Sequence, residues 1–187
     1  MLKNYVTRNI NLVNSNIETK REEILNYFTT TYELFEKLFD TFVDDNVYYN
    51  QPEPLRHQMI FYYGHTSTFF INKLILAKLI PNRINPQYES MFAVGVDEMS
   101  WDDLNKAHYH WPTVEQTKDY RKKAKELVIN YIKNCEFRLP ITWKSPMWPI
   151  IMGIEHEKIH VETSSVLHRQ IDIDLIKPNS FGKECTE

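Results

Sequence analysis

Two histidines, His156 and His160, stand four residues apart in a segment whose pattern is helical. At this spacing their imidazoles lie on one face of a helix, one turn apart, and can bind a single metal ion. A cation uses neutral imidazoles as ligands, whereas two charged imidazoles on an inward face would repel each other. Hydrogen-bonded or solvent-facing histidines are the alternative. Because burial of an unpaired polar group is costly, the pair favours a metal site.

A third ligand is expected from another helix. In the helical segment that follows Pro54, His65 shares an inward stripe with Phe69 and Leu76. His57 lies about 80° round the same helix from His65, taking 100° per residue. Periodicity therefore favours His65 over His57 as the third ligand.

The other histidines have different expected roles. His108 and His110 precede Trp111 in a connection, where histidines are expected as polar surface residues. His168 is near the predicted end of its helix and off the face of His160, so it is expected to interact with terminal carbonyls. Met152 and Leu167 flank the His156 and His160 pair at helical spacing, which predicts a core-facing ligand surface.

Residues 156–160 also spell H-E-x-x-H, the zinc-peptidase motif in which the glutamate, here Glu157, is the general base. The extended form of that motif requires glycine at position 163 and histidine at position 166, but Thr163 and Val166 stand there. Little chain follows His160 to supply a downstream glutamate ligand. A zinc peptidase is therefore the more remote hypothesis.

The composition bounds the kind of protein. The chain has 187 residues, of which 42% are hydrophobic and 25% charged, as in an ordinary soluble globular domain. Its four glycines stand singly, which excludes glycine-rich phosphate loops. A net charge of -3 with dispersed basic residues argues against nucleic acid, and no apolar stretch is long enough to cross a membrane. Two distant cysteines, Cys135 and Cys185, fit a reducing compartment and a cytoplasmic location.

The elements that must position the histidines are helices. Proline positions and apolar periodicity predict an all-α protein with four long helices and no strand, at about 17–42, 55–79, 113–137 and 145–170. Asn16 is a candidate N-cap, Thr113 and Gln116 form a candidate capping box, and Pro149 leaves the start of the fourth helix open. The connection between Pro81 and Pro112 is long enough to predict short helical turns or a functional loop.

Three segments, residues 55–74, 84–104 and 145–166, resemble the N-terminal DinB-like domain of the sulfoxide synthases of ovothiol biosynthesis, which are related to those of ergothioneine biosynthesis. The resemblance implies a DinB-like four-helix bundle with a long connection between its second and third helices. It implies a non-haem iron(II) held by His65, His156 and His160. It also implies a reaction that joins the sulfur of cysteine to the imidazole carbon of histidine with O₂, giving a sulfoxide.

The chain departs from that family in its length. The family enzymes continue into a domain that resembles the formylglycine-generating enzyme, and 187 residues do not accommodate one. We therefore expect a single DinB-like domain over residues 1–187, with an N-terminal arm at 1–16 and a tail or linker at 171–187, which is an incomplete catalyst without a partner domain in cis or in trans. The alternative is a free-standing DinB-like thiol transferase or metal-binding protein that uses zinc or nickel. Within the polar run from Asp97 to Asp103, the residues that match the family's loop are expected to pack and cap, and they are Asp97, Glu98, Trp101 and Asp102.

Overall fold

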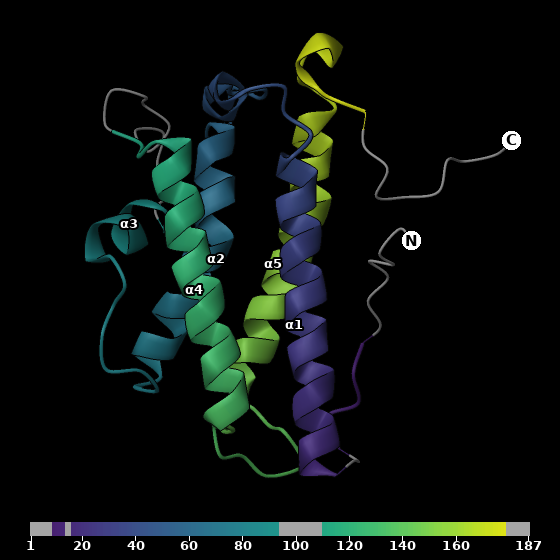
Figure 1. Ribbon diagram of the computed structural model, residues 1–187, viewed down its shortest axis with the longest axis vertical. Coiled ribbons are helices and arrows are strands. Elements are labelled where there is room, and N and C mark those ends of the chain that lie inside the picture. The colour runs from purple at the N-terminus through teal and green to yellow at the C-terminus, as the bar shows by residue number, and fades with distance from the viewer. Residues whose placement is uncertain (1–8, 14–15, 94–109, 179–187) are drawn as a thin grey trace, which may run out of the picture.

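Four long helices form the body of the molecule (Figure 1). The computed structural model describes residues 9–13, 16–93 and 110–178. The long helices are α1 (Ile17–Phe39), α2 (Met59–Leu76), α4 (Val114–Asn134) and α5 (Trp148–His168). Within the described ranges there is no β-strand, which confirms the predicted all-α fold.

The helices pack as a square in which α1 and α2 each contact both α4 and α5. Followed by colour in Figure 1, α1 and α5 run upward, whereas α2 and α4 run downward. Because α2 and α4 are parallel, the chain must return along the bundle between them. The return contains the short helix α3 (Pro86–Met91), as the length of this connection predicted.

Two predicted helix starts are confirmed by their caps. The Asn16 side chain accepts a hydrogen bond from the Glu18 amide at 2.8 Å, at the start of α1. At the start of α4, the Thr113 hydroxyl accepts from the Gln116 amide at 3.1 Å, and the Gln116 side chain accepts from the Thr113 amide at 2.9 Å. Both caps satisfy amides that have no partner within the helix.

Helix α2 is shorter than predicted at both ends. Residues 51–57 form turns, and the helix begins at Met59 rather than directly after Pro54. At the other end, Lys78 has a left-handed φ of 57°, while the amides of Lys78 and Leu79 each donate, at 2.9 Å, to carbonyls of the last helical turn. This is a Schellman motif, so the helix ends at Leu76 before Pro81 is reached. Helix α1 likewise ends at Phe39, three residues before its predicted end.

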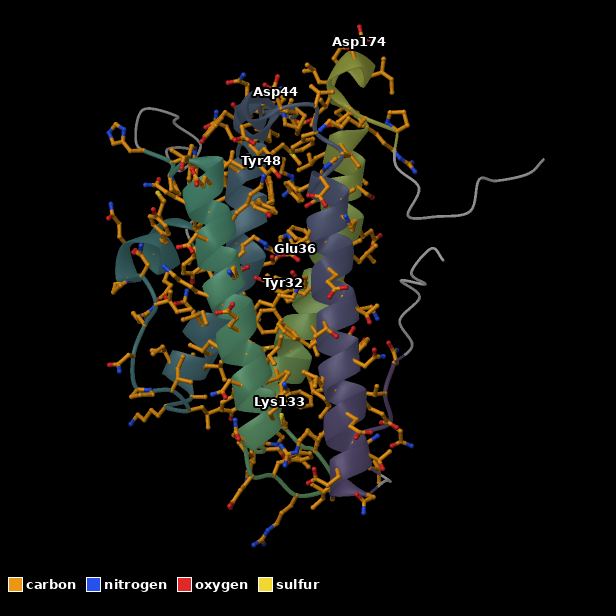
Figure 2. All side chains as sticks on the ribbon, in the orientation of Figure 1. Tyr32, Glu36, Asp44, Tyr48, Lys133 and Asp174 are labelled. Atoms are coloured by element: carbon orange, nitrogen blue, oxygen red, sulfur yellow. The ribbon has the colours of Figure 1, made fainter. Side chains whose placement is uncertain are left out.

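The core contains two apolar clusters, one toward each end of the bundle. Phe39, Phe61 and Tyr63 belong to the first, and Phe28 and Phe70 to the second. A buried polar layer lies where they meet. Figure 2 shows Tyr32 and Glu36 at mid-height on α1, between Tyr48 near one end and Lys133 near the other.

The chain closes one end of the bundle with two short 3-10 helices, η1 (Asp45–Tyr49) and η4 (Ile173–Leu175). After η4 the backbone lies against the end of α1, where the Val43 amide donates to the Leu175 carbonyl at 3.1 Å. The first part of the segment predicted as a tail is therefore packed, whereas residues 179–187 lie outside the described part of the chain. None of the described helices has the length and apolar character needed to span a membrane.

Candidate metal centre

The structure brings together the three histidines that the sequence selected. His65 on α2 and His156 and His160 on α5 each offer a ring nitrogen, and these nitrogens lie within 4.8 Å of one another. His65 is 4% exposed and His160 is 9% exposed, whereas His156 is half-buried. We call these three residues the histidine cluster.

The separation within the cluster suits coordination of one ion. The Nε2 atoms of His65 and His156 are 3.2 Å apart. Two imidazole nitrogens about 2.1 Å from the same ion, at tetrahedral or octahedral angles, lie about 3.0–3.4 Å apart. The two rings therefore stand in a position from which both can bind a single metal ion.

The His65 ring is oriented by the protein backbone. Its Nδ1 lies 2.6 Å from the carbonyl oxygen of Phe92, the residue that follows α3. A carbonyl only accepts, so Nδ1 carries the proton and Nε2 presents its lone pair to the cluster. The Phe92 ring reaches this place because residue 64 is glycine: a Cβ on Gly64 would lie only 2.5 Å from that ring.

Aromatic rings cover the cluster on the α2 side. The Phe61 ring stacks on His65 with centroids 5.2 Å apart, and the Phe69 ring stacks on His156 at 3.7 Å. These rings limit the motion of the two imidazoles. Phe69 and His156 are both half-buried, so the cluster is most open to solvent at this pair.

The electrostatics of the cluster keep the His156 and His160 rings neutral. Burial lowers the pKa of His156 to about 2, and the neighbouring His160 and His65 act in the same direction. Burial likewise lowers the pKa of His160 to about 3, again with His65 contributing. At neutral pH both rings therefore have a lone pair available for a cation.

The residues present fit a bound metal ion. The Nε2 atoms of His65 and His156 face each other at 3.2 Å, and a cation bound between them gives both lone pairs a partner. Three convergent neutral imidazoles form a donor set that suits iron, zinc, nickel or copper.

Glu157, the second residue of the H-E-x-x-H segment, points away from the cluster. Its side chain is 0% exposed, and its Oε1 accepts from the Thr66 hydroxyl at 3.2 Å and from the Arg121 guanidinium at 3.4 Å. Burial raises the pKa of Glu157 to about 7, against the lowering effect of Arg121. A carboxylate enclosed in this way cannot serve as the exposed general base of a peptidase, which disfavours the zinc-peptidase hypothesis.

The remaining histidines lie elsewhere. His57 precedes α2 and packs against Phe61, with centroids 4.2 Å apart and ring planes tilted by 34°. His168 places Nδ1 2.7 Å from the Ser164 carbonyl, as expected near a helix end, and stacks on Phe42 at 4.7 Å. His110 is exposed. His108 and the loop residues Asp97, Glu98, Trp101, Asp102 and Asp103 lie outside the described ranges.

Sequence reasoning did not single out Arg121, which is 0% exposed. It stands in the run Arg121-Lys122-Lys123, the exception to the dispersed basic residues, and this run lies within a helical pattern. Its position in a helical stripe with Thr117, Ala124 and Val128, all buried, was the signal that could have identified it. We call Arg121 and Glu157 the core pair.

Comparison with known proteins agrees with this fold. A family model described as the DinB superfamily matches residues 27–164, and the chain belongs to that superfamily. The chain is also similar to ergothioneine biosynthesis protein 1 of Schizosaccharomyces pombe, with 30% identity over 126 residues that cover 63% of this chain and 16% of that protein. The protein of the same name from Neurospora crassa is 28% identical over 132 residues, which cover 67% of this chain and 15% of that protein. The chain thus spans about a sixth of the length of these curated relatives.

Proposed function

We propose that this chain is the metal-binding domain of a sulfoxide synthase that joins the sulfur of cysteine to the imidazole carbon of histidine with O₂. The observation that carries the proposal is the convergence of His65, His156 and His160 in a chain similar to ergothioneine biosynthesis protein 1. The ovothiol type of reaction, with histidine as the acceptor, rests on the resemblance of residues 55–74, 84–104 and 145–166 to that family. The proposed compartment is the cytoplasm, without nucleic-acid or membrane partners.

The ion proposed for the histidine cluster is iron(II). Bound iron(II) would supply activation of O₂ and a coordination position for the cysteine thiolate. The chain's own contribution is to hold three neutral imidazoles on one side of the ion, with His65 fixed by the Phe92 carbonyl. Phe61 stacks on His65 and Phe69 stacks on His156, so these two imidazoles are each held against an aromatic ring of α2.

A second protein domain is proposed to complete the substrate pocket. On the outer face of α5, Met152, Ile159 and Val166 are 38%, 58% and 52% exposed. They recur every seven residues, and His156 lies on the same face, one turn after Met152. An apolar stripe beside a half-open metal site suits a partner that covers both. The partner proposed is a domain resembling the formylglycine-generating enzyme, in cis or in trans.

The second candidate function is a DinB-like thiol transferase, or a metal-binding protein, that uses zinc or nickel. It is favoured by the donor set itself, because three neutral imidazoles bind these ions as well as iron. The two candidates differ in their need for O₂. A thiol transferase moves a thiolate to an electrophile without consuming oxygen, whereas sulfoxide formation consumes it.

Oxygen uptake separates the two functions. The chain is loaded anaerobically with iron(II), supplied with cysteine and histidine, and exposed to O₂, alone and with the partner domain added. His156→Ala tests dependence on the histidine cluster, and His168→Asn is its matched control, because His168 is a buried histidine of the same helix outside the cluster.

Oxygen uptake that requires both amino acids, with a product whose mass contains both and added oxygen, is the expected result. It should be lost in His156→Ala and kept in His168→Asn. Thiol transfer to an added electrophile with zinc or nickel, without oxygen uptake in any combination, would contradict the proposed function and support the second candidate.

A further inference from the structure

Arg121 is the most completely enclosed charged side chain of α4, a helix that contributes nothing to the histidine cluster. Its NH1 donates to the Tyr63 carbonyl at 2.7 Å and to the Thr66 hydroxyl at 2.9 Å, both on α2. Its NH2 donates to Glu157 on α5 at 3.4 Å. One rigid guanidinium therefore contacts the two helices that carry the three histidines.

The residues that Arg121 holds are the immediate neighbours of the histidine cluster. Thr66 follows His65 in α2, and Glu157 follows His156 in α5. The Thr66 hydroxyl also donates directly to Glu157 at 3.2 Å, so the two helices are joined at the level of the cluster. A shift of α2 along α5 that separated His65 from His156 would therefore also break these bonds.

This network is not expected to raise the free energy of unfolding, because taking a charged pair out of water costs several kcal/mol for each ion. Replacement of such a pair by apolar residues is often neutral or stabilising. What a directional, fully buried network can provide is a single relative position of the helices that it joins.

We infer that Arg121 is a positioning residue: through Thr66 and Glu157 it fixes the register of α2 against α5, and thereby the distance from His65 to His156 and His160. The inference rests on the proposed role of the histidine cluster as the metal ligands. It concerns the geometry of the site and requires no particular reaction.

The double variant Arg121→Met with Glu157→Leu tests the inference, because it removes both charges together and leaves neither without its partner. Glu36, which lies 3.8 Å from Arg121, keeps Lys125 at 3.2 Å. The variant should melt cooperatively with a stability close to that of the parent. Its cobalt(II) affinity should fall by about 10–100-fold, taking as the guide the effect of outer residues that orient metal ligands, and its ligand-field spectrum should change.

Two further variants complete the experiment. Arg21→Met is the matched control: Arg21 also joins two helices, donating to the Ile132 and Cys135 carbonyls at 2.6 and 2.8 Å, but it contacts neither α2 nor α5 there. It should lower stability and leave the cobalt spectrum unchanged. Arg121→Lys keeps the positive charge but lacks the planar guanidinium with its several N–H donors. Its cobalt(II) affinity should therefore fall between those of the parent and the double variant.

Unchanged cobalt affinity and an unchanged spectrum in the double variant would overturn the inference. If that variant does not fold, Arg121→Lys decides by the same two measurements, since a parental affinity and spectrum there would also overturn it. Failure of the proposed ligand set is distinguishable, because the parent chain would then bind cobalt equally well without His65, His156 or His160.

Discussion

The histidine cluster and the core pair take neighbouring residues from α5, but the two groups lie in different surroundings. On α5, His156 belongs to the cluster and Glu157 to the pair. The cluster has depressed histidine pKa values, and it is partly exposed at His156. Arg121 and Glu157 are both 0% exposed and bond to each other, to Thr66 and to the backbone, while Arg121 Nε and Glu157 Oε2 have no hydrogen-bond partner among the described residues.

This difference shows how one short motif can serve two purposes. Consecutive residues of a helix point about 100° apart, so H-E-x-x-H places its histidines at the edge of the bundle and its glutamate in the core. At the edge a ligand can reach the side chains. In the core a side chain can only hold helices together, and the role of Glu157 is therefore structural.

Removal of Glu157 from the core pair, with Arg121 kept, should have the largest effect on the free energy of unfolding. Glu157→Leu leaves the Arg121 charge buried without its closest carboxylate and should lower the free energy of unfolding by about 3–5 kcal/mol. Adding Arg121→Met should restore most of that loss, because no unpaired charge is left. Urea denaturation of the two variants and the parent measures both steps. A single variant as stable as the double variant would contradict this account of the pair.

The packing that orients His65 should give the next largest effect. In Gly64→Ala the new methyl group would lie 2.5 Å from the Phe92 ring and must displace it. We expect a loss of about 1–3 kcal/mol in stability, as for other overpacked cores, together with weaker cobalt binding because the Phe92 carbonyl moves. Phe92→Leu in the same chain gives the methyl group room and should recover part of both losses. Full metal affinity in Gly64→Ala would show that this carbonyl does not orient His65.

Lowering the pH should destabilise the protein through His156 of the histidine cluster, by a smaller amount than the substitutions above. His156 has a folded pKa near 2 and an unfolded pKa near 6.5, so its unfolded form binds the proton first. Protonation of His156 in the unfolded chain therefore lowers the free energy of unfolding as the pH falls below about 6.5. Between pH 7.5 and pH 5, His156→Gln should lose about 1–2 kcal/mol less stability than the parent in metal-free buffer.

The comparison in acid is made between two proteins that share every other titrating group. Glu157, whose raised pKa acts in the opposite direction, is present in both and cancels. Equal acid sensitivity of the two proteins in urea denaturation would mean that the folded and unfolded forms bind the His156 proton equally.

The parts of the fold and site that sequence reasoning predicted depend on local chemistry. Caps at Asn16 and Thr113 follow from side chains that reach nearby amides, and the four-residue spacing of His156 and His160 follows from the helix itself. His65 was preferred to His57 on the period of a predicted helix that included both residues, whereas α2 begins after His57. Each of these features is determined within a few residues of chain.

The parts that were missed depend on packing between helices. Lys78 adopts a left-handed conformation that its residue type does not favour, so the end of α2 could not be located from the nearby proline. Met152 was expected beside the ligands on a core face, yet it is 38% exposed because that face of α5 is at the edge of the bundle. Arg121 lies in the buried stripe of α4 whereas its basic neighbour Lys122 does not, and the partners of Arg121 come from other helices.

Metal stoichiometry tests the central claim most directly. The parent chain is equilibrated anaerobically with iron(II), and bound metal per chain is measured by elemental analysis after dialysis. We expect one ion per chain in the parent and in Glu157→Gln, and none in His65→Ala, His156→Ala or His160→Ala. Stoichiometric binding that survives each histidine substitution, or that is lost only when Glu157 is changed, would contradict the assignment of the histidine cluster as the metal centre.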